Sequence, residues 1–198
     1  MEPTLDELIA RHFPQEEAAI RAYADFLKGA GIERGLIGPR EGERIWERHI
    51  LNSLFVCQLL PQGASLFDIG SGAGLPGIVI ALSRPDLKVT LIEPLERRVE
   101  FLKEATAGTE IQVIRGRAQD VKKSADYVTA RAVAALDKLK KMSWHMLKMN
   151  GSLLAMKGES AAKEMEAVPG SILHEITLEG IGLGRVVELK KLPKVPSQ

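Results

Sequence analysis

The residues of this chain best suited to chemistry lie together in the stretch LFDIGSGAGLPGIVIAL, residues 66–82. Four glycines, at positions 70, 72, 74 and 77, follow an apolar run that contains Asp68. Glycine accepts positive φ and lets a ligand approach the main chain closely, so this segment offers backbone N–H donors in place of side chains. The carboxylate of Asp68 is placed to orient the loop or to bind a cationic group of a ligand.

Two ligand-binding patterns fit these letters. From residue 72 the segment reads G-x-G-x-x-G, the dinucleotide fingerprint, in which a helix N-terminus faces a pyrophosphate. From residue 70 it reads G-x-G-x-G with Asp68 two residues ahead, the loop of methyltransferases that use S-adenosylmethionine. That molecule has no phosphate and carries an ammonium group that a carboxylate can bind. Asp68 and the 70-72-74 spacing therefore favour the second pattern.

A second acidic residue follows at a useful distance. Glu93 ends the apolar run KVTLIE, 21 residues after Gly72, where an acid accepts hydrogen bonds from ribose hydroxyls. Both patterns contain such an acid, so Glu93 predicts a nucleoside ligand without choosing between them. Two strand-like runs at 171–180 and 183–192 form a predicted C-terminal hairpin. Such a hairpin is typical of these methyltransferases and unusual in dinucleotide dehydrogenases.

Basic side chains also follow predicted strands. Arg131 comes after DYVTA and Lys157 ends LLAMK, and ligands bind at the carboxyl ends of strands in open α/β sheets. Because an arginine there can anchor a phosphate or a carboxylate by paired hydrogen bonds, Arg131 is the one candidate for a catalytic role. No nucleophile–base pair stands out, and no metal-ligand spacing does either, so we predict no metal.

The predicted elements that position these residues are helices in the first part of the chain and alternating strands and helices in the second. Residues 1–61 predict a helical extension, with helices at 5–13, 15–31 and 44–60. Residues 62–198 predict a Rossmann-like, class I S-adenosylmethionine-dependent methyltransferase domain of α/β class, because apolar strands alternate with helices at 94–105 and 135–147. The sheet is expected to be mostly parallel, with seven strands at 65–69, 88–93, 110–115, 125–130, 151–157, 171–180 and 183–192.

The composition is that of an ordinary globular domain. Of 198 residues, 45% are hydrophobic and 27% are charged, with a net charge of +1, so a nucleic-acid partner would have to meet a local basic patch. No apolar run approaches the roughly 18 residues that span a bilayer. The lone Cys57 predicts a buried thiol, and the run DKLKKM (137–142) predicts a solvated basic helix face. We expect a monomer in the cytoplasm without membrane association.

Six segments, in chain order, resemble one family: the bacterial ribosomal RNA small subunit methyltransferase G, also called glucose-inhibited division protein B. Leu-Pro-Gly after the glycines is more specific than the general methyltransferase loop. The matching segments are RHILNSL (48–54), FDIGSGAGLPGI (67–78), ERRVEFLKE (96–104), GRAQDV (116–121), DYVTARAVAAL (126–136) and NGSLLAMKG (150–158).

This resemblance implies methyl transfer from S-adenosylmethionine to N7 of one guanosine in 16S ribosomal RNA, near the decoding site. It implies cofactor contacts from Gly70, Leu75, Ala118, Gln119 and Arg131. The loop and strand pattern itself indicates Asp68, Gly72, Gly74 and Glu93. Guanine N7 has an unshared pair and no proton, so the chemistry calls for alignment and desolvation without a general base.

The predicted RNA contacts are basic residues outside the loop: Arg44, Arg48, His49, Arg117 and Lys157. Two positions depart from the family pattern. Asn52 stands where the family has Asp, so a role that needs a charge there is not carried over. Gln119 stands where an acid is common, which leaves a backbone contact to adenine but no carboxylate contact.

Other functions fit parts of the same pattern. They are methylation of another RNA or of a small molecule, cofactor binding by a regulator without turnover, and an NAD oxidoreductase. The residues that indicate the cofactor are more distinctive than those that indicate the substrate, so the substrate alternatives stay open at the level of sequence.

Overall fold

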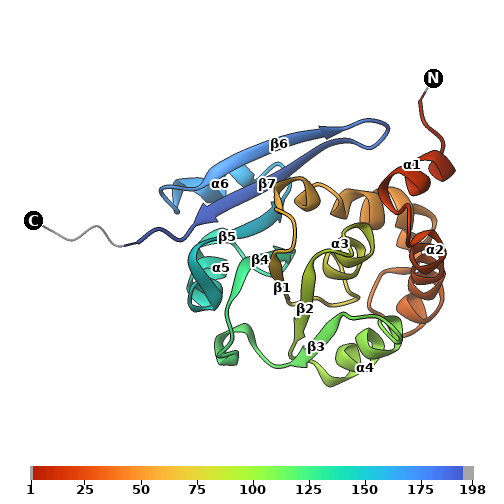
Figure 1. The fold of residues 1–198 in the computed structure, drawn as a ribbon, viewed down its shortest axis with the longest axis horizontal. Helices are drawn as coiled ribbons and strands as arrows, with labels where there is room; N and C mark the ends of the chain where they lie inside the picture. The colour runs from red at the N-terminus through yellow and green to blue at the C-terminus, as the bar shows by residue number, and fades with distance from the viewer. Residues whose placement is uncertain (1, 194–198) are drawn as a thin grey trace, which may run out of the picture.

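A single seven-stranded sheet with helices on both faces forms the frame of the molecule in the computed structural model, which describes residues 2–193 (Figure 1). The spatial order of the strands is β3-β2-β1-β4-β5-β7-β6. Their bounds are β1 Ser65–Ile69, β2 Lys88–Glu93, β3 Gln112–Arg115, β4 Ala125–Arg131, β5 Leu147–Lys157, β6 Ile172–Leu178 and β7 Gly182–Lys190.

The first five strands are parallel, and the last two turn back. β1 pairs in parallel with β2 and β4, while β5 pairs antiparallel with β7 and β7 with β6. β1 and β2 are almost wholly buried, which explains their continuous apolar sequence. The predicted fold class, a mostly parallel sheet ending in a hairpin, is confirmed. The strand order reverses between β1 and β4, the position where open α/β sheets bind ligands.

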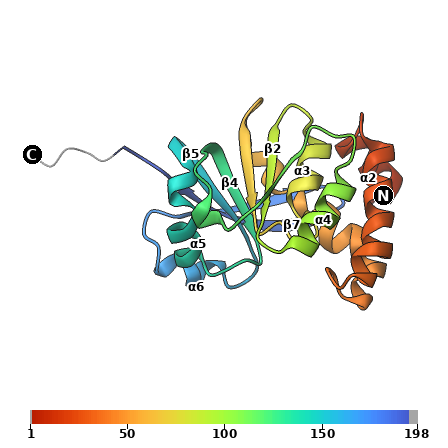
Figure 2. The ribbon, with the colours of Figure 1, turned by 90° about the horizontal axis from the view of Figure 1, so that it is seen from below.

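Two hydrophobic cores fill the two faces of the sheet. On one face lie α3 (Gly77–Ser83), α4 (Glu96–Ala105) and the N-terminal helices, and on the other lie α5 (Leu136–Ser143) and α6 (Ala161–Glu166) (Figure 2). Phe13 and Ile20 of the extension share the first core with Leu66 and Leu91 of the sheet. The extension is therefore packed into the same core that supports the centre of the sheet. The division into residues 1–61 and 62–198 stays a prediction.

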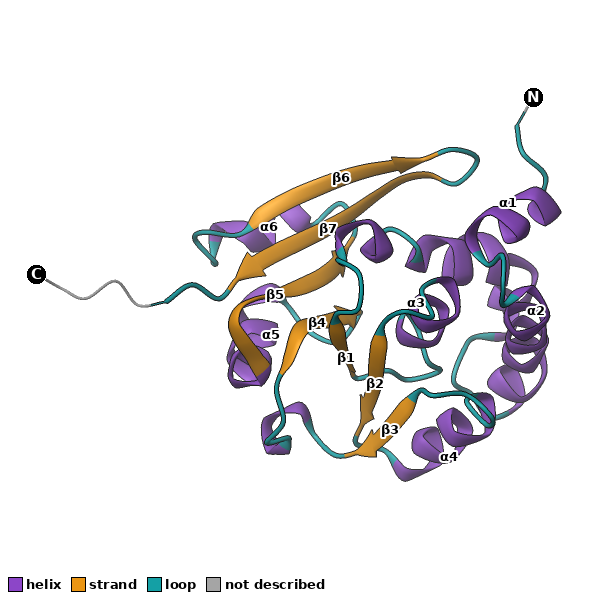
Figure 3. Cartoon of the chain, viewed as in Figure 1, coloured by secondary structure: helices purple, strands orange, loops and turns teal. Residues whose placement is uncertain are grey.

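The extension begins with α1 (Leu5–His12) and α2 (Glu17–Phe26) and continues in short helical turns (Figure 3). Thr4 and Glu7 form a reciprocal capping box at the start of α1. The turns are η1 (Leu27–Gly31), η2 (Pro39–Arg44), η3 (Ile45–Leu51) and η4 (Val56–Leu59), of which η1 and η3 have π geometry and the others 3₁₀ geometry.

The prediction of one continuous helix over 44–60 is wrong, because the segment divides into the π turn η3 and the 3₁₀ turn η4, with a turn at 54–55 between them. Ser53 Oγ donates to the His49 carbonyl over 2.7 Å, and the Arg131 guanidinium donates to the carbonyl of Arg48 over 3.1 Å. The predicted helix over 135–147 is also too long. It ends at Ser143, the 3₁₀ turn η6 (Trp144–Met146) follows, and β5 starts at Leu147. The short α6 was not predicted.

Candidate functional site

The glycine loop leaves β1 at the carboxyl edge of the sheet and bends back into α3. Gly70, Gly72 and Gly74 have φ of 65°, 59° and 97°, the left-handed region that favours glycine. A Cβ on Gly70 would lie 2.8 Å from Val133 Cγ2. A Cβ on Gly72 would meet only the Gly70 carbonyl, at 3.8 Å. The side of the loop at Gly72 is therefore open, and a ligand can approach the main chain there.

Asp68 lies beneath this loop with one carboxylate oxygen bonded and the other not. Its Oδ2 accepts the amide of Gly77 over 3.1 Å, while Oδ1 is buried and has no partner among the described residues. Its exposed fraction is 0%. Burial raises the pKa of this carboxyl to about 7, against the lowering effects of the Ser71 side chain and the Gly77 amide. A buried acceptor without a donor is uncommon, and Oδ1 lacks a donor from any of the described residues.

Glu93, at the end of β2, holds the other side of the loop. Its Oε2 accepts the amide of Gly72 over 2.9 Å and its Oε1 accepts the amide of Leu95 over 3.0 Å. The side chain is buried, and Arg98 Nη1 lies 3.8 Å from Oε2. Each carboxylate oxygen keeps a further lone pair for a hydroxyl donor. Glu93 thus links the end of β2 to the loop that follows β1 by a hydrogen bond. The spacing in the sequence predicted only that the two lie near each other.

Tyr23 is a residue at the site that sequence reasoning missed. It reaches from α2 to donate its hydroxyl to the Ala73 carbonyl over 2.8 Å, and burial raises its pKa well above the ordinary value. The only sequence signal was its place on the buried stripe of α2, with Ile20, Ala24 and Leu27. That stripe indicates packing, and its hydrogen bond to a loop 50 residues away was not foreseeable.

Arg131 extends from the end of β4 to the extension. Its Nη2 lies 2.9 Å from His49 Nδ1, and His49 Nε2 lies 2.8 Å from Glu41 Oε2. This arrangement assigns a neutral imidazole that accepts from Arg131 and donates to Glu41. Burial and the Arg131 charge both lower the pKa of His49. Among residues 2–193, no carboxylate pairs with Arg131, so its half-buried charge is available to an anion.

The remaining predicted cofactor residues flank the loop. Ala118 is buried and Gln119 exposed in the 3₁₀ turn η5 (Ala118–Asp120), which follows β3 at the same edge. The amide of Gly116 donates to the Glu93 carbonyl over 3.1 Å and ties this turn to β2. Leu75 is partly buried against the first core. The carboxyl edge therefore gathers all the predicted cofactor residues, from four neighbouring strands.

The predicted RNA contacts are more scattered. Arg44 pairs with Glu47 over 2.9 Å and Arg48 with Glu41 over 3.2 Å, both on exposed parts of the extension. Lys157 pairs with Glu164 over 2.7 Å and donates to the Ala134 carbonyl, with 10% of its side chain exposed. Arg117 is exposed. Lys157 is thus not the free lysine that its strand-end position suggested, and the RNA roles of these residues stay predictions.

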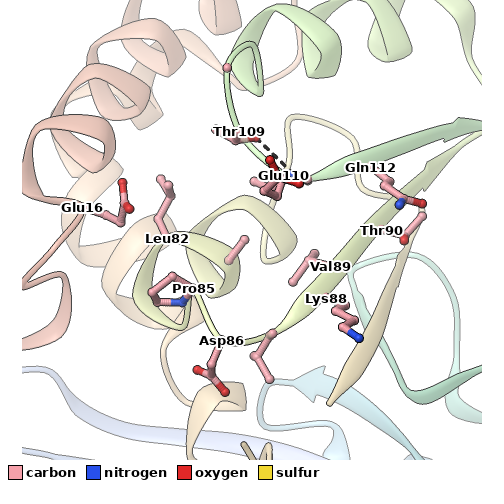
Figure 4. A pocket seen from close by; sticks show the side chains of 14 residues that line it. Glu16, Leu82, Pro85, Asp86, Lys88, Val89, Thr90, Thr109, Glu110 and Gln112 are labelled. Carbon is pink, nitrogen blue, oxygen red and sulfur yellow. Dashed lines mark hydrogen bonds between the residues drawn. The ribbon is translucent and has the colours of Figure 1, made fainter. Parts of the chain in front are cut away.

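A cavity of about 640 Å³ lies elsewhere, at the amino edge of β2 and β3. Figure 4 shows its lining, which includes Glu16, Asp86, Lys88 and Glu110. The glycine loop, Asp68 and Arg131 all lie at the opposite edge, so this cavity is separate from the candidate site. Across residues 2–193, no three His, Cys, Asp or Glu side chains are grouped to hold a metal. In the same range, no helix is long and apolar enough to cross a membrane.

Comparison with known proteins finds one family that matches most of this chain. A family model described as "rRNA small subunit methyltransferase G" matches residues 16–179. The Ribosomal RNA small subunit methyltransferase G of Mycobacterium marinum is 48% identical over 194 residues, which cover 94% of this chain and 82% of that protein. The protein of the same name from Mycolicibacterium gilvum is 52% identical over 191 residues, covering 93% and 82%.

Solved structures share the fold at low identity. A methyltransferase from Pyrococcus furiosus matches with a TM-score of 0.59 and 14% identity, covering 91% of this chain and 100% of that one. The ribosomal protein L11 methylase from Lactobacillus delbrueckii subsp. bulgaricus matches with a TM-score of 0.57 and 15% identity, covering 71% and 77%. At such identities these two structures support the fold alone.

Proposed function

Because this chain belongs to the rRNA small subunit methyltransferase G family, we propose that it transfers a methyl group from S-adenosylmethionine to N7 of a guanosine in 16S ribosomal RNA. The observation that carries the proposal is the set of unsatisfied groups at the carboxyl edge. There, a glycine loop is open at Gly72, and among residues 2–193 a buried Asp68 oxygen has no donor and Arg131 has no carboxylate partner.

The residues present fit S-adenosylmethionine. The free Asp68 oxygen offers an acceptor to an ammonium group, and Arg131 offers a positive charge to a carboxylate. The buried Glu93 carboxylate offers acceptors to ribose hydroxyls, and Ala118 and Gln119 would border the adenine. Gly70, Gly72, Gly74 and Leu75 would contribute the main chain against which the amino-acid end and ribose rest.

When bound, S-adenosylmethionine supplies a methyl group on a positively charged sulfonium sulfur. The chain's own task is to orient the acceptor and exclude water, since guanine N7 has no proton to remove. Tyr23 and Glu93 fix the loop through the Ala73 carbonyl and the Gly72 amide, so the loop needs little rearrangement to bind. No residue is assigned as a general base.

We further propose that Arg44, Arg48, His49, Arg117 and Lys157 contact the RNA or border its cleft, and that the enzyme acts in the cytoplasm as a monomer. His49 is the best placed of these five, because it lies beside Arg131 at the carboxyl edge. A splayed guanine entering there would meet the extension on one side and the glycine loop on the other.

The test offers labelled S-adenosylmethionine with deproteinised 16S RNA, with assembled small subunits and with a panel of small molecules. Cleavage selective for 7-methylguanosine then locates the modified base. We expect label at one guanosine of 16S RNA. Label only in another RNA or in a small molecule would show that 16S RNA is not the substrate. Tight cofactor binding without label in any fraction would favour a regulator that does not turn over.

A further inference from the structure

Helix α5 lies on the face of the sheet away from the extension (Figure 2), and its sequence contains Lys138, Lys140 and Lys141. Lys138 and Lys141 are three positions apart and exposed, so they lie on the same side of the helix. His145 is four positions further, and its Nε2 lies 3.1 Å from the Val121 carbonyl. The exposed Lys122 and Lys123 follow Val121 directly. We name Lys122, Lys123, Lys138, Lys140 and Lys141 the lysine surface.

The charge of the chain is concentrated here. Residues 117–148 contain 8 Lys and Arg against 3 Asp and Glu, a net charge of +5 in a chain whose total is +1, so the rest carries −4. Of the three acids, Asp126 pairs with Lys148 over 3.0 Å and Asp137 lies 3.7 Å from Lys141. Within residues 2–193, Lys122, Lys123 and Lys138 form no ion pair. A near-neutral protein thus presents one local field that attracts a polyanion.

The position of Lys140 indicates which part of a nucleic acid this surface could contact. Its Nζ lies 5.3 Å from the centre of the Trp144 ring, a cation–π contact that covers the indole. A cavity of about 480 Å³ beside it is lined by Asp137, Lys141 and Val168, among others. Because Lys140 occupies the face of the indole, the surface offers point charges for phosphates instead of a stacking platform for bases.

We infer that the lysine surface binds the sugar–phosphate backbone of the RNA substrate at a distance from the methylated base. This inference rests on the proposed function. α5 starts just after the loop that follows Arg131, and Glu164 Oε2 accepts the amide of Leu136 at its first residue, over 2.8 Å. The helix has eight residues and is about 12 Å long. A folded RNA with one base at the carboxyl edge therefore has phosphates within reach of the surface.

The apolar side of α5 argues against a lipid partner. Leu136 and Leu139 are fully packed in the second core, so the helix has no apolar face left to enter a membrane, as interfacial helices do. The exposed side carries charge alone. An RNA backbone, which needs charge and no insertion, matches this surface better.

The experiment removes three charges and keeps the fold. We substitute Lys122→Gln, Lys138→Gln and Lys141→Gln together, and compare a control with Lys28→Gln, Lys88→Gln and Lys103→Gln, three exposed lysines of the extension, β2 and α4. Binding to deproteinised 16S RNA and to small subunits is measured against salt, with S-adenosylhomocysteine affinity as the check on folding. The slope of log K against log salt should become shallower by about 2–3 in the surface variant, at ~0.7–0.9 per lost contact.

At low salt, we expect RNA affinity to fall on the order of 10- to 100-fold in the surface variant, with KM for RNA raised, kcat little changed and no effect in the control. Equal RNA binding by both variants, with wild-type methylation intact, would overturn the lysine surface and leave the proposed function standing. Weakened binding to phosphatidylglycerol vesicles with RNA binding unchanged would assign the surface to a membrane and overturn it too. Absence of any RNA binding or methylation by the wild type would refute the proposed function itself.

Discussion

Asp126 and Asp68 lie on neighbouring strands at opposite edges of one sheet, and their carboxylates differ in how many partners they have. Asp126, at the amino edge, accepts the Ser65 amide over 2.9 Å and Lys148 Nζ over 3.0 Å. Burial raises the pKa of its carboxyl, but these hydrogen bonds outweigh burial and hold it at about 2. Asp68, at the carboxyl edge, has one amide for one oxygen and a pKa raised to about 7.

The arginines of the two edges differ in the same way. Arg84, at the amino edge, donates to the Leu60 carbonyl over 3.0 Å and pairs with Asp86 through two hydrogen bonds. Arg131, at the carboxyl edge, also donates to carbonyls but pairs with no carboxylate among the described residues. The charged groups at the amino edge thus have their hydrogen-bond and ion-pair partners, whereas at the carboxyl edge an Asp68 oxygen and the charge of Arg131 lack them among the described residues. Buried groups without partners lower the stability of the free protein, and they are expected where a ligand supplies the missing partners.

The largest effect should come from replacing one glycine at each edge by valine. Gly72 and Gly63 have φ of 59° and 72°, and a Cβ at either meets no close neighbour. Gly72→Val and Gly63→Val should therefore cost similar strain, about 1–2 kcal/mol. We expect Gly72→Val to abolish S-adenosylhomocysteine binding in calorimetry, because the side chain fills the open side of the loop, and Gly63→Val to bind normally. Equal binding by the two variants would remove the ligand from this loop.

The second effect concerns stability and its dependence on pH. The folded pKa of Asp68 is raised from 3.8 to about 7, so its contribution to stability is fully present below pH 3.8 and is lost as pH rises through about 7. Asp68→Asn should then stabilise the free protein at pH 8 by on the order of 4 kcal/mol, at ~1.4 kcal/mol per pKa unit. Cofactor affinity should fall in the same variant, because the negative charge for the ammonium group is lost.

Asp126→Asn is the matched control for Asp68→Asn. Its folded pKa is lowered to about 2, so its contribution is present above pH 3.8 and is lost as pH falls through about 2. This substitution should destabilise the protein at pH 7 by about 1 kcal/mol, a value discounted for its partly exposed side chain, and leave cofactor binding unchanged. Chemical denaturation at several pH values measures both variants. A destabilised Asp68→Asn at pH 8 would contradict the assignment of an unsatisfied carboxylate.

The third effect compares the two arginines. Arg131→Ala should reduce cofactor affinity or turnover by on the order of 10- to 1,000-fold, ~1–4 kcal/mol for a charge-assisted contact in a half-buried site. Arg84→Ala should instead lower the midpoint of unfolding, since Asp86 and the Leu60 carbonyl lose their donor, and leave affinity unchanged. If a folded Arg131→Ala variant binds and turns over normally, Arg131 serves only to hold the extension in place.

The succession of strands along the chain and the position of the glycine loop at a strand end could be predicted from the sequence alone. Continuous apolar runs such as KVTLIE are typical of a sheet covered on both faces, and the closely spaced glycines after SLFDI mark a sharp turn with positive φ. Because these signals are local, each is present in a short stretch of chain. Asp68 and Glu93 could be assigned to the site for the same reason, since each ends a strand.

Which hydrogen bonds those residues form was decided by the tertiary structure. Oδ1 of Asp68 has no hydrogen-bond partner among residues 2–193, and no local sequence pattern encodes this. The hydrogen bond of Tyr23 to the Ala73 carbonyl joins residues 50 apart in the chain, and that of Arg131 to the Arg48 carbonyl joins residues 83 apart. Sequence periodicity records which side of an element faces inward, but hydrogen bonds and charges are satisfied by whichever groups packing brings within about 3 Å. The elements and the chemical types at the site were thus determined locally, and the groups left free to bind were determined by the fold.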